Sequence, residues 1–205
     1  MDTEHKSEDF FEFKENFLGF DFIFASCDNV FSKNEIDYGT KVLINAIIKN
    51  FDLNKKKCLD LGCGLGVVTI ALSKFFDKAS FVLSDITSIA CKLSEENLKK
   101  NNCKNFMIKK SDLFENLDEK FDYIITNPPI RAGKKLLLKL IDDSTMFLEN
   151  NGKLVLVIRK NHGEESIKKY METKLKNVEI LKRDKGFYVL AGEYDNNDWK
   201  TKKRK

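Results

Sequence analysis

Short apolar runs of strand length alternate along this chain with amphipathic segments of helical length, and this alternation constrains the fold more than any other feature. The runs at 57–61, 80–85, 121–126 and 153–158 are apolar at most of their interior positions, as expected of strands that are buried on both faces. Repeated strand–helix units predict a parallel sheet covered by helices on both sides. We therefore expect an α/β fold with its ligand site at the carboxyl ends of the strands.

The same periodicity predicts the remaining elements. Asn151 and Gly152 are expected to stop the helix that precedes them. Two apolar runs on either side of the Arg183–Gly186 turn predict a β-hairpin near the end of the chain. Further helices are expected around 42–47 and at 67–76, 86–101, 134–148 and 164–175, and further strands at 20–24, 105–109, 178–181 and 186–190.

The composition fits one soluble domain. The 205 residues are 42% hydrophobic and 33% charged, which is typical of a globular rather than a disordered chain. No apolar run approaches the roughly 18 residues of a membrane span, and the charged N-terminus lacks the apolar region of a secretory signal. We expect a cytoplasmic protein with no membrane partner, and the sequence leaves its oligomeric state open.

Metal and disulfide chemistry is not expected. The five cysteines form no Cys-x-x-Cys pair and the chain has only two histidines, so neither a zinc site nor a disulfide framework is indicated. One of these histidines, His162, fits a loop or the start of a helix, and an RNA contact is the alternative.

The chain is expected to comprise three segments. A β-rich lead-in over 1–35 belongs to the same domain as the main α/β part over 36–195, and a basic tail follows at 196–205. The net charge is +4, and five positive charges in the last six residues leave −1 for the rest. Such a tail either binds phosphates or is a solvated end, and the sequence does not decide between them.

A glycine-rich loop, Asp60-Leu-Gly-Cys-Gly-Leu-Gly66, follows the first buried strand. Glycines allow a sharp turn and a close approach of a ligand to the backbone. The dinucleotide fingerprint requires glycine where this chain has Val67, and the Asp60 carboxylate would repel a pyrophosphate but attract a cation. S-adenosylmethionine carries an ammonium and a sulfonium and no phosphate. The loop therefore predicts this cofactor rather than a nicotinamide dinucleotide.

Two further acids follow the next two strands. Asp85 ends its strand about twenty residues after the loop, where a carboxylate can accept both ribose hydroxyls. Asp112 is placed to accept from an adenine amino group. Each acid alone could be a loop residue or a helix N-cap; three acids at successive strand ends favour a nucleoside site.

The only two prolines are adjacent, in Asn127-Pro128-Pro129-Ile130 directly after the 121–126 strand. Proline stiffens the backbone and restricts the residue before it, so the strand end offers two fixed acceptors, the Asn127 side-chain oxygen and the Pro128 carbonyl. A purely structural strand exit is the alternative interpretation. Two acceptors holding the hydrogens of an aromatic exocyclic amine would turn its lone pair toward a sulfonium methyl, which is catalysis by positioning and electrostatics.

These motifs carry a resemblance. The Asp60–Gly66 loop with Asn127–Ile130 resembles class I, S-adenosylmethionine-dependent amino methyltransferases. The segment 31–40, Phe-Ser-Lys-Asn-Glu-Ile-Asp-Tyr-Gly-Thr, is similar to the lead-in of the small-domain methyltransferase family, which includes the catalytic half of the bacterial small-subunit rRNA guanine-N2 methyltransferase. The continuation 127–134 resembles stand-alone members, and the likeness covers roughly 10–192.

The resemblance implies a Rossmann-like sheet of seven strands with the last strand reversed, and ribosomal RNA as substrate. It implies that the catalytic residues are Asn127, Pro128, Pro129 and Ile130. It implies that the cofactor is held by Asp60, Gly62, Gly64, Gly66, Asp85, Ile86, Asp112, Leu113 and Asn127.

One departure and several alternatives remain. Many Asn-Pro-Pro enzymes have an aromatic residue where this chain has Ile130, so stacking on the target base is weaker or comes from elsewhere, for example from Arg131. Asn-Pro-Pro signatures also occur in adenine and protein-glutamine methyltransferases. A non-catalytic nucleotide- or RNA-binding module could share the fold, whereas a dehydrogenase is disfavoured by Asp60 and Val67.

Overall fold

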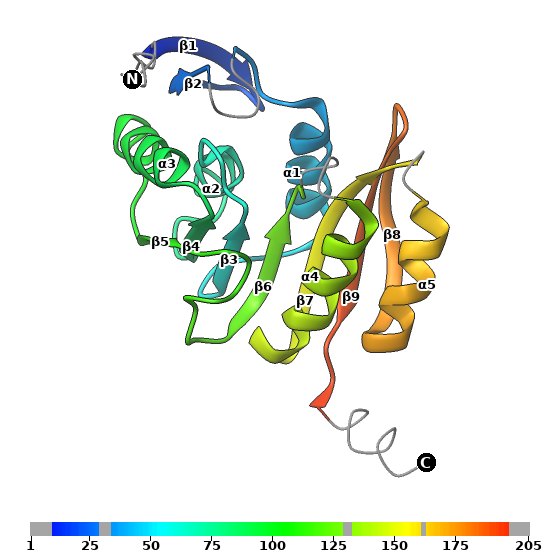
Figure 1. The fold of residues 1–205 in the computed structure, drawn as a ribbon. Helices are drawn as coiled ribbons and strands as arrows, with labels where there is room; N and C mark the ends of the chain where they lie inside the picture. The colour runs from blue at the N-terminus through cyan, green and yellow to red at the C-terminus, as the bar shows by residue number, and fades with distance from the viewer. Residues whose placement is uncertain (1–9, 29–33, 129–132, 161–162, 197–205) are drawn as a thin grey trace, which may run out of the picture.

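The computed structural model describes residues 10–28, 34–128, 133–160 and 163–196, which form a small two-stranded sheet and a seven-stranded sheet covered by helices (Figure 1). The elements in chain order are β1 (Phe10–Phe17), β2 (Phe20–Cys27), α1 (Tyr38–Asn50), β3 (Lys57–Leu61), α2 (Val67–Leu72), β4 (Ser80–Asp85), α3 (Ser88–Lys100), β5 (Phe106–Lys110), β6 (Phe121–Thr126), α4 (Gly133–Phe147), β7 (Leu148–Arg159), α5 (Glu164–Lys174), β8 (Lys176–Asp184) and β9 (Phe187–Glu193).

The large sheet has the strand order β5-β4-β3-β6-β7-β9-β8. Strands β5, β4, β3, β6 and β7 are parallel to one another, whereas β9 is antiparallel to both β7 and β8. The last strand of the chain is thus the reversed one, and it forms the expected hairpin with β8. The chain adds β4 and β5 on one side of β3 and then β6 and β7 on the other. The space beyond the carboxyl ends of β3 and β6 is therefore where a ligand is expected.

Helices cover both faces of this sheet. On one face α1, α2 and α3 pack over buried side chains that include Tyr123 and Ile125 of β6. On the other face α4 and α5 pack over a second set that includes Ile124. The alternate residues of β6 therefore enter different cores, which explains why Tyr123, Ile124 and Ile125 form an uninterrupted apolar run.

No helix in the described ranges is long and apolar enough to cross a membrane.

Helix α3 begins later than predicted. It starts at Ser88 rather than Ile86, because Thr87 caps it by accepting a hydrogen bond from the backbone N–H of Ala90. This cap leaves Ile86 in the preceding loop with 56% of its surface exposed. Helix α2 is also shorter than predicted, since it ends at Leu72 rather than Phe76.

The prediction that Asn151 and Gly152 stop a helix is wrong. Helix α4 already ends at Phe147, and both residues lie within β7. The strand register shifts here: Asn151 has φ 65 and donates its backbone N–H to the Tyr194 carbonyl. A Cβ at Gly152 would lie 2.9 Å from two backbone oxygens. The Asn-Gly pair therefore marks an irregularity in the strand.

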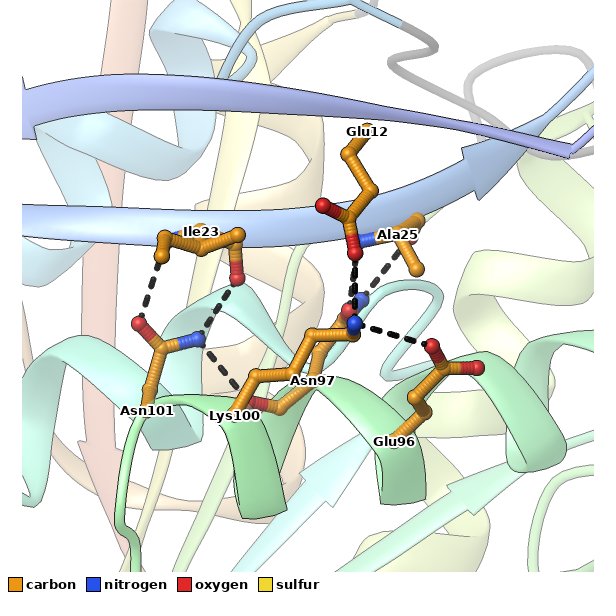
Figure 2. Close-up of polar contacts among 7 residues, drawn as sticks. All are labelled: Glu12, Ile23, Ala25, Glu96, Asn97, Lys100 and Asn101. Carbon is orange, nitrogen blue, oxygen red and sulfur yellow. Dashed lines mark hydrogen bonds and ion pairs between the residues drawn. The ribbon is translucent and has the colours of Figure 1, made fainter.

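The N-terminal hairpin of β1 and β2 docks onto α3 through two asparagine side chains (Figure 2). Asn97 accepts from the Ala25 N–H at 2.6 Å and donates to the Ala25 carbonyl at 3.0 Å. Asn101 makes the same pair of contacts with Ile23, at 3.2 and 2.7 Å. The two amides thus take the place of a neighbouring strand along the edge of β2, and the Lys100 ammonium adds an ion pair to Glu12.

We expect Asn97→Ala to lower the free energy of unfolding by roughly 1–3 kcal/mol, because it leaves buried backbone groups of Ala25 without partners. Asn45→Ala is the matched control, since that exposed side chain donates only to the preceding turn of α1, and it should change stability by less than about 0.5 kcal/mol. Urea unfolding of both variants measures the difference. Equal stabilities would mean that the amide ladder does not hold the hairpin.

Candidate active site

The glycine loop turns sharply after β3. Gly62 and Gly64 have φ of 73° and 53°, which side chains other than glycine rarely adopt. An added Cβ at either position would meet no atom within 4 Å. The conformation rather than crowding therefore requires glycine here, and the space beside the loop is open for a ligand to approach the backbone. Gly66 differs, because a Cβ there would lie 3.2 Å from Ser94 of α3.

Asp60 lies near the end of β3 and is buried, with 3% of its surface exposed. Its Oδ2 accepts from the backbone N–H of Thr69 at 3.2 Å and from the Thr69 hydroxyl at 2.8 Å. Burial raises the pKa of Asp60 to about 6; the Thr69 hydrogen bonds lower it and the nearby charge of Asp85 raises it. A carboxylate placed this way ties β3 to α2. A cation beside it would stabilise its charged form and so offset the cost of its burial.

Asp85, the last residue of β4, is joined to the same loop. Its Oδ2 accepts from the Gly64 N–H at 3.1 Å, and its Oδ1 accepts from the N–H and hydroxyl of Thr87 at 2.9 and 3.0 Å. The neighbouring Ile86 is exposed. A carboxylate and an apolar side chain thus adjoin at this strand end, which suits the ribose and the base of a nucleoside.

The loop after β5 lies against the loop after β4, because the Ser111 N–H donates to the Asp85 carbonyl at 2.9 Å. Asp112 is exposed, and Leu113 is half-buried with φ 46. The structure therefore brings the expected acidic strand ends into one continuous row. It shows no contact between Asp112 and either of the other acids.

Asn127 follows β6 and is held from a direction that the sequence did not predict. Its Nδ2 donates to Asp37 Oδ2 at 3.0 Å and to the Thr40 hydroxyl at 2.8 Å. Asp37 is the N-cap of α1 and also accepts from the Thr40 N–H. A carboxylate can only accept, so the amide nitrogen faces α1 and the Asn127 oxygen is turned away as an acceptor.

A hydrogen bond joins this strand end to the glycine loop. Thr126, directly before Asn127, donates its hydroxyl hydrogen to the carbonyl of Leu61 at 2.8 Å, directly before Gly62. The two motifs that were read separately in the sequence are therefore neighbours at the switch point of the sheet. Pro128 is described and half-buried; Pro129, Ile130, Arg131 and His162 lie outside the described residues.

Sequence reasoning missed the partners that hold these groups, namely Asp37, Thr40, Thr69 and Thr126. Asp37 alone left a signal, since an acid three residues before Thr40 at the start of an amphipathic segment is typical of a helix N-cap. Within the part of the chain that the structure describes, no group of three or more His, Cys, Asp or Glu side chains could hold a metal. The arrangement thus offers two carboxylates, an open glycine loop and one oriented amide.

The buried charge of Asp60 predicts a pH dependence of stability. Asp60→Asn keeps an acceptor for Thr69 and removes the charge. Because the folded-state pKa is raised from 3.8 to about 6, the stability that protonation contributes is fully present below pH 3.8 and is lost as the pH rises through about 6. Without ligand, the variant should match the wild type near pH 4 and exceed it by up to roughly 3 kcal/mol above pH 7. Urea unfolding across this range measures the difference, and a difference independent of pH contradicts a buried Asp60 charge.

Comparison with known proteins identifies relatives along nearly the whole chain. Residues 21–191 match the family model described as methyltransferase small domain. An uncharacterized protein of Bacillus subtilis, YbxB, is 36% identical over 177 residues, which are 84% of this chain and 86% of that protein. Ribosomal RNA small subunit methyltransferase C of Buchnera aphidicola is 33% identical over 189 residues, which are 88% of this chain but 56% of that protein.

A solved structure has the same fold. The T. thermophilus 16S rRNA N2 G1207 methyltransferase, in complex with AdoMet and guanosine, superposes with a TM-score of 0.79 at 24% identity. The match covers 90% of this chain and 50% of that one, so the chain spans about half the length of this neighbour. The predicted class I methyltransferase sheet is thereby confirmed.

Proposed function

The chain belongs to the methyltransferase small domain family, and from that premise we propose that it methylates guanine N2 in small-subunit ribosomal RNA with S-adenosylmethionine as methyl donor. Relatives that are 33–38% identical carry the name ribosomal RNA small subunit methyltransferase C. The observation that carries the proposal for the reacting group is the orientation of Asn127, whose amide nitrogen is held by Asp37 and Thr40.

The residues around the glycine loop fit S-adenosylmethionine. Gly62 and Gly64 leave open space beside the backbone, and the buried Asp60 carboxylate would be relieved by the ammonium of the methionine moiety. Asp85 would accept from the ribose hydroxyls, and the exposed Ile86 offers an apolar surface for the adenine ring. We assign Asp112 and Leu113 to the adenine side of the site and Gly66 to the loop that shapes it.

The residues at the end of β6 would orient the target amine. The lone pair of an exocyclic amine is delocalised into the ring, so the free base is a poor nucleophile. In our proposal the Asn127 oxygen and the Pro128 carbonyl each accept one amine hydrogen, which turns the lone pair out of the ring plane. Pro129 and Ile130 complete the segment. When bound, S-adenosylmethionine supplies the electrophilic methyl group, and the protein needs no tuned general base because the amine proton can leave after attack.

The contacts of Asn127 favour catalysis over a passive module. An asparagine that only capped a strand exit would bond to its own loop, whereas Asn127 is fixed by two groups about 90 residues away. These two contacts fix the amide plane, so the Asn127 oxygen is held in one orientation, away from α1. The same chemistry would serve adenine or a glutamine side chain, and the names of the relatives favour guanine.

Nucleoside analysis tests the substrate. Unmodified small-subunit rRNA, alone and assembled into subunits, is incubated with the protein and a deuterated methyl donor, then digested and examined by mass spectrometry. We expect labelled N2-methylguanosine. Label on adenosine would replace guanine by adenine, and label on glutamine in a peptide digest of the subunit proteins would point to a protein substrate. Cofactor binding without transfer to any of these would favour the non-catalytic module.

The cofactor contact of Asp60 has a separate test. We expect calorimetry to detect binding of S-adenosylmethionine and not of NAD, and Asp60→Asn to weaken that binding by roughly 1.5–3 kcal/mol through loss of a charged hydrogen bond. Asp77→Asn is the matched control, because Asp77 is exposed and precedes β4 at the opposite edge of the sheet. Unchanged affinity in the Asp60 variant would remove this residue from the cofactor site.

The catalytic role of Asn127 predicts a loss of turnover. Asn127→Ala should reduce kcat by on the order of 10²–10³ without weakening cofactor binding, by analogy with loss of one oriented polar group in other active sites. Asn127→Asp keeps an acceptor oxygen but replaces the amide that donates to Asp37 by a carboxylate that can only accept. Repulsion between the two carboxylates should turn that oxygen out of position, so kcat should fall in this variant as well. Asp37→Ser keeps a helix cap but is too short to hold Asn127, so kcat should fall while stability changes little. Methylation by Asn127→Ala at the wild-type rate would disprove the mechanism.

A further inference from the structure

Four exposed cations gather where β7 ends and β8 turns into β9, namely Arg159, Lys160, Arg183 and Lys185. We propose that these four residues, here called the cationic tip, bind phosphates of the RNA strand whose target base enters at Asn127. The proposal rests on RNA as the substrate and adds the surface that would recognise it.

The charges of the cationic tip are not neutralised by neighbouring acids. Many lysines of this protein form ion pairs, for example Lys56, Lys57 and Lys153. Among the described residues no ion pair involves any member of the cationic tip. The single acid of the turn, Asp184, accepts from the Tyr38 hydroxyl at 3.1 Å and lies 3.8 Å from Lys182. The body of the chain without its last six residues has a net charge of −1, so this excess of positive charge is local.

Aromatic rings orient three of the four cations. The Arg159 guanidinium lies 4.9 Å from the Phe187 ring centroid, Lys185 Nζ lies 4.9 Å from that of Tyr38, and Arg183 lies 5.6 Å from that of Tyr188. Contact with a ring face fixes a cation without cancelling its charge. Such side chains lose less entropy on binding a phosphate than free ones, and they keep their full electrostatic attraction.

Strand pairing places these groups in adjacent rows. Arg159 of β7 is opposite Phe187 of β9, and Phe187 is opposite Asp184 of β8. The backbone N–H of Lys160 donates to the Gly186 carbonyl at 2.8 Å, which closes the end of the sheet. The positions of Arg159 and Arg183 are therefore set by the ladder, Lys160 is held by this hydrogen bond, and Lys185 lies in the two-residue turn that joins β8 to β9.

The first turn of α1 connects the cationic tip with Asn127. Here Asp37 and Thr40 hold the Asn127 amide. In the same turn the Tyr38 ring lies 5.8 Å from that of Phe187, and a Cβ at Gly39 would lie 2.7 Å from the Phe187 ring. The same Cβ would lie 2.9 Å from Asp37 Oδ2, so the ring that orients Arg159 and the carboxylate that holds Asn127 are close neighbours. Figure 1 shows the turn between β8 and β9 at the same edge as the end of β6 and the start of α1.

A strand of RNA fits this arrangement better than an apolar partner. A base held at Asn127 leaves its own backbone outside the site, and the neighbouring phosphates must lie within a few nucleotides of it. Unpaired, exposed and oriented cations at that distance supply a sequence-independent hold on the backbone. The base would then be read at the strand ends, and the backbone at the cationic tip.

The salt dependence of RNA binding tests the proposal. A fluorescein-labelled single-stranded RNA of about 20 nucleotides is titrated at several KCl concentrations with wild type and with Arg159→Gln/Lys185→Gln. Each lost phosphate contact should reduce the slope of log Kd against log salt by about 0.7, so the double variant should lose about 1.4. Lys78→Gln/Lys104→Gln is the matched control, because both lysines are exposed and precede β4 and β5 at the opposite edge.

The outcomes separate this proposal from the proposed function. We expect the cationic-tip variant to raise KM for rRNA and to keep kcat and the affinity for S-adenosylmethionine. The same salt slope as wild type, or an equal reduction in the control, overturns the cationic tip whether or not rRNA is methylated. A reduced slope in the cationic-tip variant alone supports the surface, even if the wild type transfers no methyl group to RNA and the proposed function fails.

Discussion

The parallel pairing of β3 with β4 on one side and β6 on the other is the constraint on which the rest of the structure depends. Parallel strands end at one edge, so the residues that follow them must meet there. Asp60, Asp85 and Asn127 come from three different strands and are far apart in the sequence. Their proximity results from the strand ladder, and the hydrogen bonds from Thr126 to Leu61 and from Gly64 to Asp85 complete it.

Much of the fold could be predicted because local patterns and global structure agree. The strands at 57–61, 80–85 and 121–126 have the predicted bounds, since apolar residues that fill two cores leave little freedom of register. The errors occurred where one signal has two meanings. Asn151-Gly152 is typical of a helix end, but here it lies in a strand whose register shifts against β6. The predicted start of α3 was also two residues early, because the apolar Ile86 was counted with the helix although Thr87 caps it.

The site could be predicted only for residues that belong to short motifs. Asp60 and Asn127 stand at fixed distances from glycines and prolines, and this spacing drew attention to them. Asp37 and Thr40 reach Asn127 from about 90 residues away, and no spacing along the chain indicates that contact. The Thr69 contact changes the interpretation of Asp60, because a carboxylate proposed to meet only a ligand is also part of the joint between β3 and α2.

The contact between the N-terminal hairpin and α3 has a consequence for the order of folding. The hairpin closes through pairs such as Phe17 with Phe20, which are near in sequence and form in roughly microseconds. Its dock consists of Asn97 and Asn101, which lie more than 70 residues away and present their amides only once α3 is helical. Contacts of such long sequence separation form late, because the intervening chain must first be ordered. During synthesis the hairpin therefore leaves the ribosome before α3 does. The edge of β2 stays uncovered until α3 has been synthesised and has become helical.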